Sequence, residues 1–272
     1  MTFVHRDEAV AALDEEWDAL AALAGELEAS DWALPNACPG WTVKDQFSHI
    51  IAIEAMLLGR PAPDVALAGD VPYIRNEMGR VNELWAEHYR PVPVTDVLAD
   101  LGEVLISRRA ALATMTQDDF DAPAMTPAGQ DTYGRFMRIR VMDQWIHEQD
   151  VREAVGRPGH LDGRAPRLTL TEVRLSLGYA VGKKAGAPKG SSVRFVLTGP
   201  ISTRVDVVVS DRAQVVTAAS GAPTVTIEVP GDAFIRICAG RVAEGDPVNL
   251  ATRIDGDRAL GEQILGGLAY MI

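Results

Sequence analysis

The spacing of the hydrophobic residues changes near Gly156, and this change limits the folds that the chain can adopt. Before that point, apolar residues recur every three or four positions along several long segments, which predicts amphipathic helices. After it, β-branched segments with partial alternation follow one another, which predicts strands. We therefore expect a helical bundle in residues 1–160 and an α+β domain, with helices on one face of a mostly antiparallel sheet, in residues 161–272.

The elements of the bundle are predicted from periodicity and from helix-capping signals. Thr42 and Asp45 resemble a capping box in which Asp replaces the usual Glu or Gln, so a helix should begin at Val43. The stretch 116–134 is interpreted as a long loop. The expected helices cover about residues 5–30, 43–58, 73–89, 94–115 and 135–155.

The second half should contain both strands and helices. Its β-branched segments are bounded by Gly, Pro and Ser, as strands usually are. The expected strands cover residues 192–199, 203–210 and 224–230. Helices are expected over residues 168–181, within 231–243 and within 255–272.

Composition excludes several classes of protein. The net charge is −12 with a pI near 4.9, and no Lys/Arg cluster appears, which argues against nucleic acids and anionic membranes as partners. Apolar runs are too short to cross a bilayer, and the N-terminus lacks a secretory pattern. Cys38 and Cys238 form no C-x-x-C motif, which fits a reducing cytoplasm. An anionic substrate would need a local arginine to overcome the overall repulsion.

The segment 138–159 carries polar residues on a helix face that should be buried. Arg140, Asp143, His147 and Asp150 recur at spacings of three, four and three, so they share one face. Asp143 and His147 can therefore bind one ion. His49, which has apolar neighbours on the second helix, would complete a set of two histidines and one carboxylate if the two helices pack together.

Each of these residues also has an interpretation without a metal. His49 alone is more typical of a hydrogen-bonded core histidine. Asp143 and His147 can form a surface pair, and Arg140 and Asp150 can form ordinary ion pairs. The sequence "HEQDV" lacks the second histidine of the H-E-x-x-H zinc motif, and no G-x-S-x-G elbow, phosphate loop or dinucleotide fingerprint appears.

Four segments of the chain resemble a known family. "DWALPNACPGWTVKDQFSHI" and "RVMDQWIHEQDVREAVGRPG" together resemble the DinB-like metal-binding helical family, and more closely the mycothiol-dependent maleylpyruvate isomerase family. That family joins a four-helix-type bundle to a C-terminal domain related to sterol-carrier proteins. "FIRICAGRVAEGD" and "IDGDRALGEQILGGLAYMI" are similar to this second domain.

The resemblance implies a metal site and a thiol cofactor. Its ligands fall on His49, Asp143 and His147, and Asp143 stands where some members have Glu. The implied ion is a divalent metal, with zinc first and nickel or iron as alternatives. The implied thiol is mycothiol, which a metal with an open coordination position would favour in its thiolate form.

The resemblance also implies a reaction. The thiolate adds to the cis double bond of a maleylpyruvate-like acid, the resulting single bond rotates, and elimination releases the trans isomer and the thiol. If the thiol stayed attached to an electrophile, the protein would be an S-transferase. The alternatives are a hydrolase that uses bound hydroxide, and a non-enzymatic metal-stabilised protein that binds a lipid or another hydrophobic ligand.

The expected substrate is a small anionic or electrophilic molecule, and an anionic one requires cationic groups. The resemblance implies Arg241, in "CAGRV", as a catalytic arginine, and Arg140 on the ligand face is the second candidate. Arg241 can instead make a salt bridge or a helix C-cap contact. Asp150 can accept the ring N–H of a ligating histidine, or pair with Arg152 or Arg140. Trp41 is interpreted as a packing residue beside the cap rather than a substrate platform.

Overall fold

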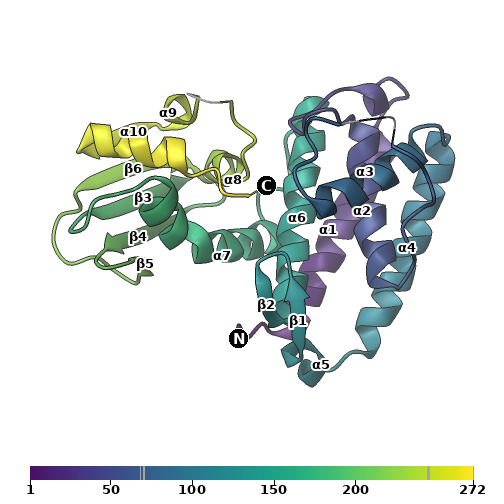
Figure 1. The fold of residues 1–272 in the computed structure, drawn as a ribbon, viewed down its shortest axis with the longest axis horizontal. Coiled ribbons are helices and arrows are strands. Elements are labelled where there is room, and N and C mark those ends of the chain that lie inside the picture. The colour runs from purple at the N-terminus through teal and green to yellow at the C-terminus, as the bar shows by residue number, and fades with distance from the viewer. Residues whose placement is uncertain (68, 70, 244–245, 272) are drawn as a thin grey trace. The chain divides into compact units, whose positions relative to one another are not determined.

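The computed structural model describes residues 1–67, 69, 71–243 and 246–271. These residues form two compact units, 1–159 and 160–272, which Figure 1 shows as a helical unit and a unit with a sheet. The predicted fold class, helical first and α+β second, is confirmed. No described helix combines the length and the apolar character that crossing a bilayer requires.

The first unit is built from long helices that pack side by side. Helix α1 packs against α6, and α2 contacts α3, α4 and α6. Large side chains such as Trp17, Phe47 and Trp145 are fully buried between them. The long helices are α1 (Arg6–Glu26), α2 (Val43–Leu57), α3 (Glu77–Tyr89), α4 (Val94–Thr114) and α6 (Tyr133–Ala154).

Caps fix where these helices begin. The predicted capping box is confirmed: the backbone N–H of Asp45 donates to the Thr42 hydroxyl, and the N–H of Thr42 donates to the Asp45 carboxylate. Helix α3 begins later than the expected residue 73, because the side chain of Asn76 accepts from the N–H of Gly79 and caps the helix there.

The prediction of a long loop over residues 116–134 is wrong. This segment instead contains a short helix, α5 (Gln117–Asp121), and an antiparallel hairpin of β1 (Pro123–Thr126) and β2 (Gly129–Thr132). Thr116 and Asp119 form a second capping box at the start of α5. These elements have four or five residues each, which is too short for a hydrophobic period to become visible in the sequence.

The second unit contains a five-stranded sheet with the strand order β5-β4-β3-β6-β7. The π-helical segment η2 (Ala180–Lys184) follows the first helix of this unit. The pairing of β3 with β6 is parallel, and the other pairings are antiparallel. The strands are β3 (Ser192–Thr198), β4 (Thr203–Val209), β5 (Ala213–Val216), β6 (Val225–Pro230) and β7 (Arg253–Gly256). The helices are α7 (Arg164–Tyr179), α8 (Gly231–Cys238), α9 (Pro247–Leu250) and α10 (Arg258–Gly267).

The core of the second unit follows the alternation of its central strands. Val193, Phe195 and Leu197 of β3 are buried, and each lies beside a buried residue of β6. The ring of Phe195 lies 5.1 Å from that of Phe234 in α8, so this helix packs on the buried face of β3. The edge strands β5 and β7 were not predicted, because few of their residues are buried and they show little alternation.

Two buried carboxyl groups meet between α1 and α6. The side chains of Glu16 and Glu148 are fully buried, and they offer oxygen atoms within 4.8 Å of each other. Burial raises the pKa of Glu16 well above its ordinary value, and the charge of Glu148 raises it further, while Arg152 acts in the opposite direction. The folded chain therefore keeps a proton on Glu16 over a pH range in which the unfolded chain has released it.

This pair predicts that the first unit loses stability as pH rises. The contribution of Glu16 is fully present below the pKa of an unfolded glutamate, and it is lost as pH approaches the raised pKa of the folded state. Urea denaturation between about pH 5 and pH 8 should show a steeper loss in the native chain than in Glu16→Gln, which cannot ionise. Glu8→Gln, an exposed change on the same helix, serves as the control. Parallel profiles for the native chain and Glu16→Gln would contradict the expectation.

Candidate metal centre

Helices α2 and α6 bring His49, Asp143 and His147 together. Nε2 of His49 lies 3.2 Å from Oδ2 of Asp143, and Nε2 of His147 lies 3.7 Å from Oδ1 of the same carboxylate. The two imidazole rings are 4.6 Å apart between centroids. Each residue offers a ligand atom, and these atoms all lie within 4.8 Å of one another.

These side chains differ in their exposure. The side chains of His49 and His147 are only 5% and 9% exposed, whereas that of Asp143 is 32% exposed. The two imidazoles are therefore buried in the bundle, while the carboxylate is partly exposed.

The protonation states of the three groups are coupled. Burial lowers the pKa of His49, with Asp143 opposing the change. Burial also lowers the pKa of His147, but the carboxylate of Asp143, together with Asp150 and Cys38, raises the pKa of His147 to about 10. Burial alone would raise the pKa of Asp143, yet the charges of Arg140 and the two histidines hold it well below its usual range.

The donor set fits a divalent transition metal. Bonds of about 2.0–2.2 Å from zinc to nitrogen and oxygen place tetrahedral ligand atoms about 3.3–3.6 Å apart. Each histidine nitrogen lies near this separation from one oxygen of Asp143, His49 at 3.2 Å from Oδ2 and His147 at 3.7 Å from Oδ1. Two imidazoles and one carboxylate leave at least one coordination position for another molecule, as catalytic metal sites do.

Arg140 connects this cluster to a buried ionic network. It donates from Nε to Oε1 of Glu54 at 3.0 Å and from Nη1 to Oδ2 of Asp143. Glu54 is fully buried and also accepts from Arg108 Nε at 2.7 Å and from Gln144 Nε2 at 2.7 Å. Glu54 was not among the site residues predicted from the sequence. The one signal was a carboxylate in the otherwise apolar helix "IIAIEAMLL".

The ring of Trp41 lies beside the rings of the two histidines. Its ring lies 5.6 Å from that of His49 and 6.2 Å from that of His147, between centroids. Its Nε1 donates to Oε2 of Glu83 at 2.9 Å, and Glu83 is 2% exposed. Tyr73 also donates to Glu83, at 2.8 Å. Sequence spacing did not reveal this contact, because Glu83 lies on α3, 42 positions from Trp41.

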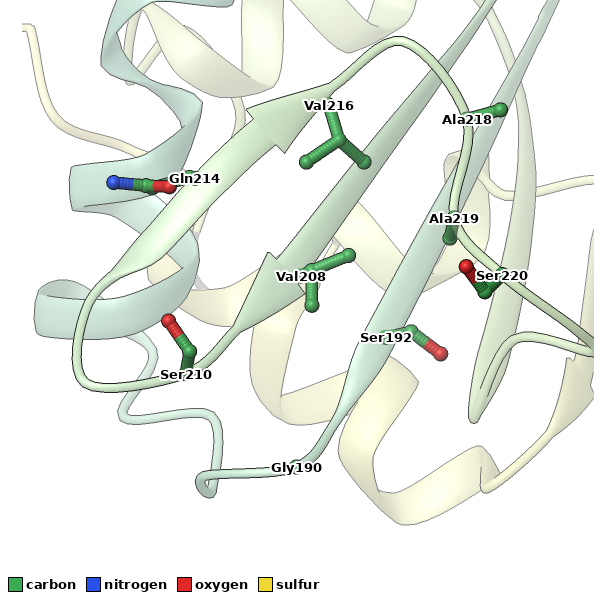
Figure 2. A pocket seen from close by; sticks show the side chains of 9 residues that line it. All are labelled: Gly190, Ser192, Val208, Ser210, Gln214, Val216, Ala218, Ala219 and Ser220. Carbon is green, nitrogen blue, oxygen red and sulfur yellow. The ribbon is translucent and has the colours of Figure 1, made fainter.

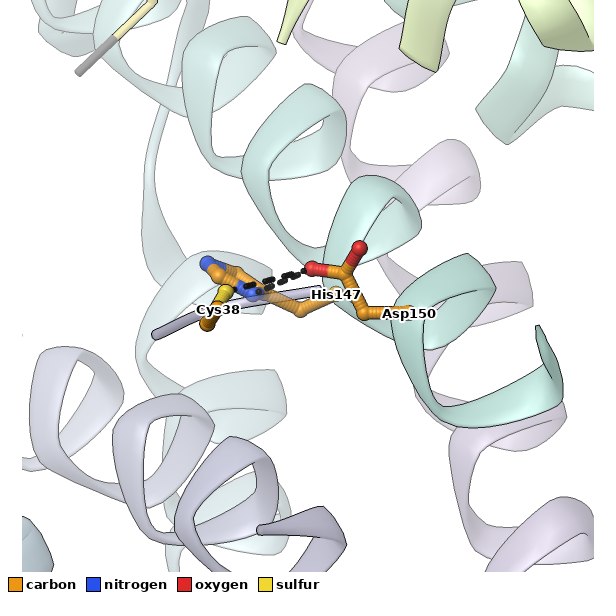
Figure 3. Close-up of side chains that lie close together, drawn as sticks. All are labelled: Cys38, His147 and Asp150. Carbon is orange, nitrogen blue, oxygen red and sulfur yellow. Dashed lines mark hydrogen bonds and ion pairs between the residues drawn. The ribbon is translucent and has the colours of Figure 1, made fainter. Parts of the chain in front are cut away.

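Asp150 and Cys38 lie on the other side of His147. Oδ2 of Asp150 lies 3.3 Å from Nδ1 of His147 and accepts a hydrogen bond from Sγ of Cys38 at 3.5 Å, as Figure 3 shows. These three residues also offer ligand atoms within 4.8 Å of one another. Cys38 was not among the predicted site residues, since a single cysteine in a loop carries no pattern.

Arg241 lies in the second unit, just after α8. Its Nη1 donates to the carbonyl oxygen of Ala239 at 3.1 Å, a contact at the C-terminal cap of α8 of the kind that the sequence allowed. The same unit has a hollow of about 380 Å³ next to β4 and β5, drawn in Figure 2. Val208, Val216 and several serines line it, and Arg241 is not among the lining residues.

Comparison with known proteins gives one family and one fold. Residues 13–152 match the family described as "Mycothiol maleylpyruvate isomerase N-terminal domain". Two crystal structures are similar, one of the mycothiol-dependent maleylpyruvate isomerase and one of a point mutant of it. They have TM-scores of 0.57 and 0.56 and 17% sequence identity, covering 90% of this chain and 94% of theirs.

No curated protein sequence matches the chain. The structural matches, at 17% identity, establish the fold and leave the activity open. The family match spans more than half of the 272 residues and includes all three residues of the cluster between α2 and α6. The chain therefore belongs to the mycothiol maleylpyruvate isomerase N-terminal domain family.

Proposed function

We propose that the protein is a metal-dependent enzyme that uses mycothiol to isomerise a small cis-unsaturated acid resembling maleylpyruvate. The observation that carries the proposal is the convergence of His49, Asp143 and His147 from two helices within the matched segment. The family and the proteins of similar structure are named for a mycothiol-dependent maleylpyruvate isomerase, which supports this choice of thiol and reaction.

In this proposal, His49, Asp143 and His147 hold the metal. A divalent cation at this place would lower the pKa of an incoming thiol and favour the nucleophilic thiolate. Zinc is the first candidate, with nickel or iron as alternatives. The histidines are buried in the bundle, and the partial exposure of Asp143 supports an approach of the thiol from its side.

The two arginines receive different roles. Arg140 has a side chain only 4% exposed and donates to Glu54 and Asp143, which supports a role in holding the Asp143 carboxylate. Its guanidinium is engaged with these two carboxylates, so we assign substrate contact to Arg241 rather than to Arg140. Arg241 is partly exposed and remains the proposed catalytic arginine that binds the anionic substrate.

An assay with and without mycothiol tests the function. Purified, metal-loaded protein should turn over maleylpyruvate only when the thiol is present. Arg241→Ala should lower kcat/KM by about 10- to 100-fold, the effect of losing a hydrogen bond between charged groups, and leave metal content unchanged. Turnover that does not require the thiol would contradict the proposal. Full activity of Arg241→Ala would contradict the catalytic role proposed for Arg241.

The products of the same assay separate isomerase from S-transferase. An isomerase regenerates the thiol and releases the trans acid, so the mycothiol concentration stays constant. An S-transferase consumes one thiol for each molecule of product and leaves a stable thioether. Both activities would use the same metal cluster, and they differ in whether elimination follows addition.

A further inference from the structure

We infer that Asp150, held in place by Cys38, is a positioning residue that orients His147 toward the metal. The inference rests on the proposed metal centre and goes beyond it, because neither residue belongs to the ligand set. It concerns which nitrogen of His147 carries the proton and which one binds the ion.

The two ring nitrogens of His147 face different partners. Nε2 faces Asp143 and the ring of His49, while Nδ1 lies 3.3 Å from Oδ2 of Asp150. A neutral imidazole binds a metal with one nitrogen and keeps its proton on the other. His147 is only 7% exposed and its Nδ1 is buried, so a proton on Nδ1 needs a partner from the protein. The carboxylate of Asp150 lies at ion-pair distance from Nδ1, and a small rotation of the ring would let it accept this proton.

The surroundings of Asp150 direct its carboxylate to His147. Asp150 is 2% exposed and lies one helical turn after His147 on α6. The two arginines that the sequence offered as its partners are engaged with other carboxylates. Arg140 donates to Glu54 and Asp143, and Arg152 donates to Glu148 at 2.7 Å. A buried carboxylate is stabilised by hydrogen-bond donors and by nearby cations, and Cys38 donates to Asp150 while Nδ1 of His147 lies at ion-pair distance from it.

Cys38 ties Asp150 to the loop before α2. Its thiol donates to the same Oδ2 that faces His147, at 3.5 Å. Its backbone N–H donates to Oδ1 of Asn36 at 2.8 Å, and Nε2 of Gln46 donates to that oxygen at 2.7 Å. Because Gln46 lies on the helix that carries His49, the loop and both ligand helices are held in one hydrogen-bonded arrangement.

Metal affinity, measured on the full chain by competition with a chelator, tests this role. Asp150→Ala should weaken zinc binding about 10- to 100-fold, the usual cost of removing such a partner of a ligating histidine. Asp150→Asn keeps an oxygen acceptor and should lose less. All variants should still bind one ion at saturating zinc. Asp118→Asn, an exposed change on α5, is the matched control and should bind as the native chain does.

The cysteine is tested in the same way. Cys38→Ala should weaken zinc binding, by less than Asp150→Ala does, and Cys38→Ser should restore part of the affinity because a hydroxyl also donates to Asp150. Cys238→Ser, at the fully buried cysteine of the second unit, is the control. If Asp150→Ala binds zinc as tightly as the native chain, the inference is wrong.

Cobalt(II) distinguishes a positioning role from direct ligation. Cys38, His147 and Asp150 form a donor set of their own, and a thiolate bound to cobalt gives an intense charge-transfer absorption in the near ultraviolet. The inference predicts no such band in the cobalt-loaded native chain. A band that disappears in Cys38→Ser would overturn it. A native chain that binds no metal would refute the proposed function, whereas native binding with an unaffected Asp150→Ala refutes the inference alone.

Discussion

His147→Ala is expected to reduce bound metal from about one ion per chain to well below one. The substitution removes one of three ligands and leaves Asp143 and His49 as a pair, which is too few to hold a divalent ion against the surrounding water. Thiol-dependent turnover should fall by about three orders of magnitude, since the charge stabilisation that a catalytic metal supplies is worth several kcal/mol. Elemental analysis of the purified protein measures the first effect.

His49→Ala should give the same result, because His49 completes the site from the other helix. His88→Ala is the matched control: His88 lies on α3, where its ring contacts Trp85 and Tyr89. It should retain the native metal content. Unchanged metal content in both His49→Ala and His147→Ala would mean that the ion, if there is one, binds elsewhere. Folding of each variant is checked by circular dichroism, because α6 must stay helical for the comparison to be valid.

The ligand cluster could be predicted because its information is local. Asp143 and His147 are four positions apart, and helical geometry places residues with this spacing on one face. His49 could be added to the predicted cluster only on the condition that α2 packs against α6. The structure confirms this packing. A polar face on a helix that must be buried already indicated that something compensates those charges.

Glu54 and Cys38 could not be predicted as supporting residues, since their contacts join distant parts of the chain. Glu54 is 54 positions from Arg108 and 86 from Arg140. Cys38 is 112 positions from Asp150. No local spacing relates such residues, and each alone has an ordinary interpretation as a surface charge or a core cysteine.

The missed strands have a different cause. Strands β1, β2, β5 and β7 have four residues each and few buried positions, so alternation between core and solvent does not develop along them. The central strands β3 and β6 were predicted, because one side of each is fully buried and the alternation is complete.

Glu54→Gln is expected to destabilise the first unit by about 3–5 kcal/mol. Glu54 is fully buried between Arg108 and Arg140, whose side chains are 2% and 4% exposed. Burial alone would lower the pKa of Arg108, but the charge of Glu54 raises it, so the guanidinium stays ionised. Glutamine has the same shape as glutamate and no charge. The variant would take from Arg108 the carboxylate that faces it and leave Arg140 paired with Asp143 alone, which costs far more than losing an exposed pair.

Urea denaturation followed by tryptophan fluorescence measures this effect on the first unit alone. The chain has five tryptophans, and all of them lie within residues 1–159. A chelator in the buffer keeps metal binding from contributing to the difference. The matched control is Glu103→Gln, whose carboxylate is 66% exposed and pairs with Arg60 at 2.7 Å; it should cost less than about 1 kcal/mol. Equal effects of the two substitutions would show that the buried network does not stabilise the bundle, and that Arg140 does not depend on Glu54 to hold Asp143.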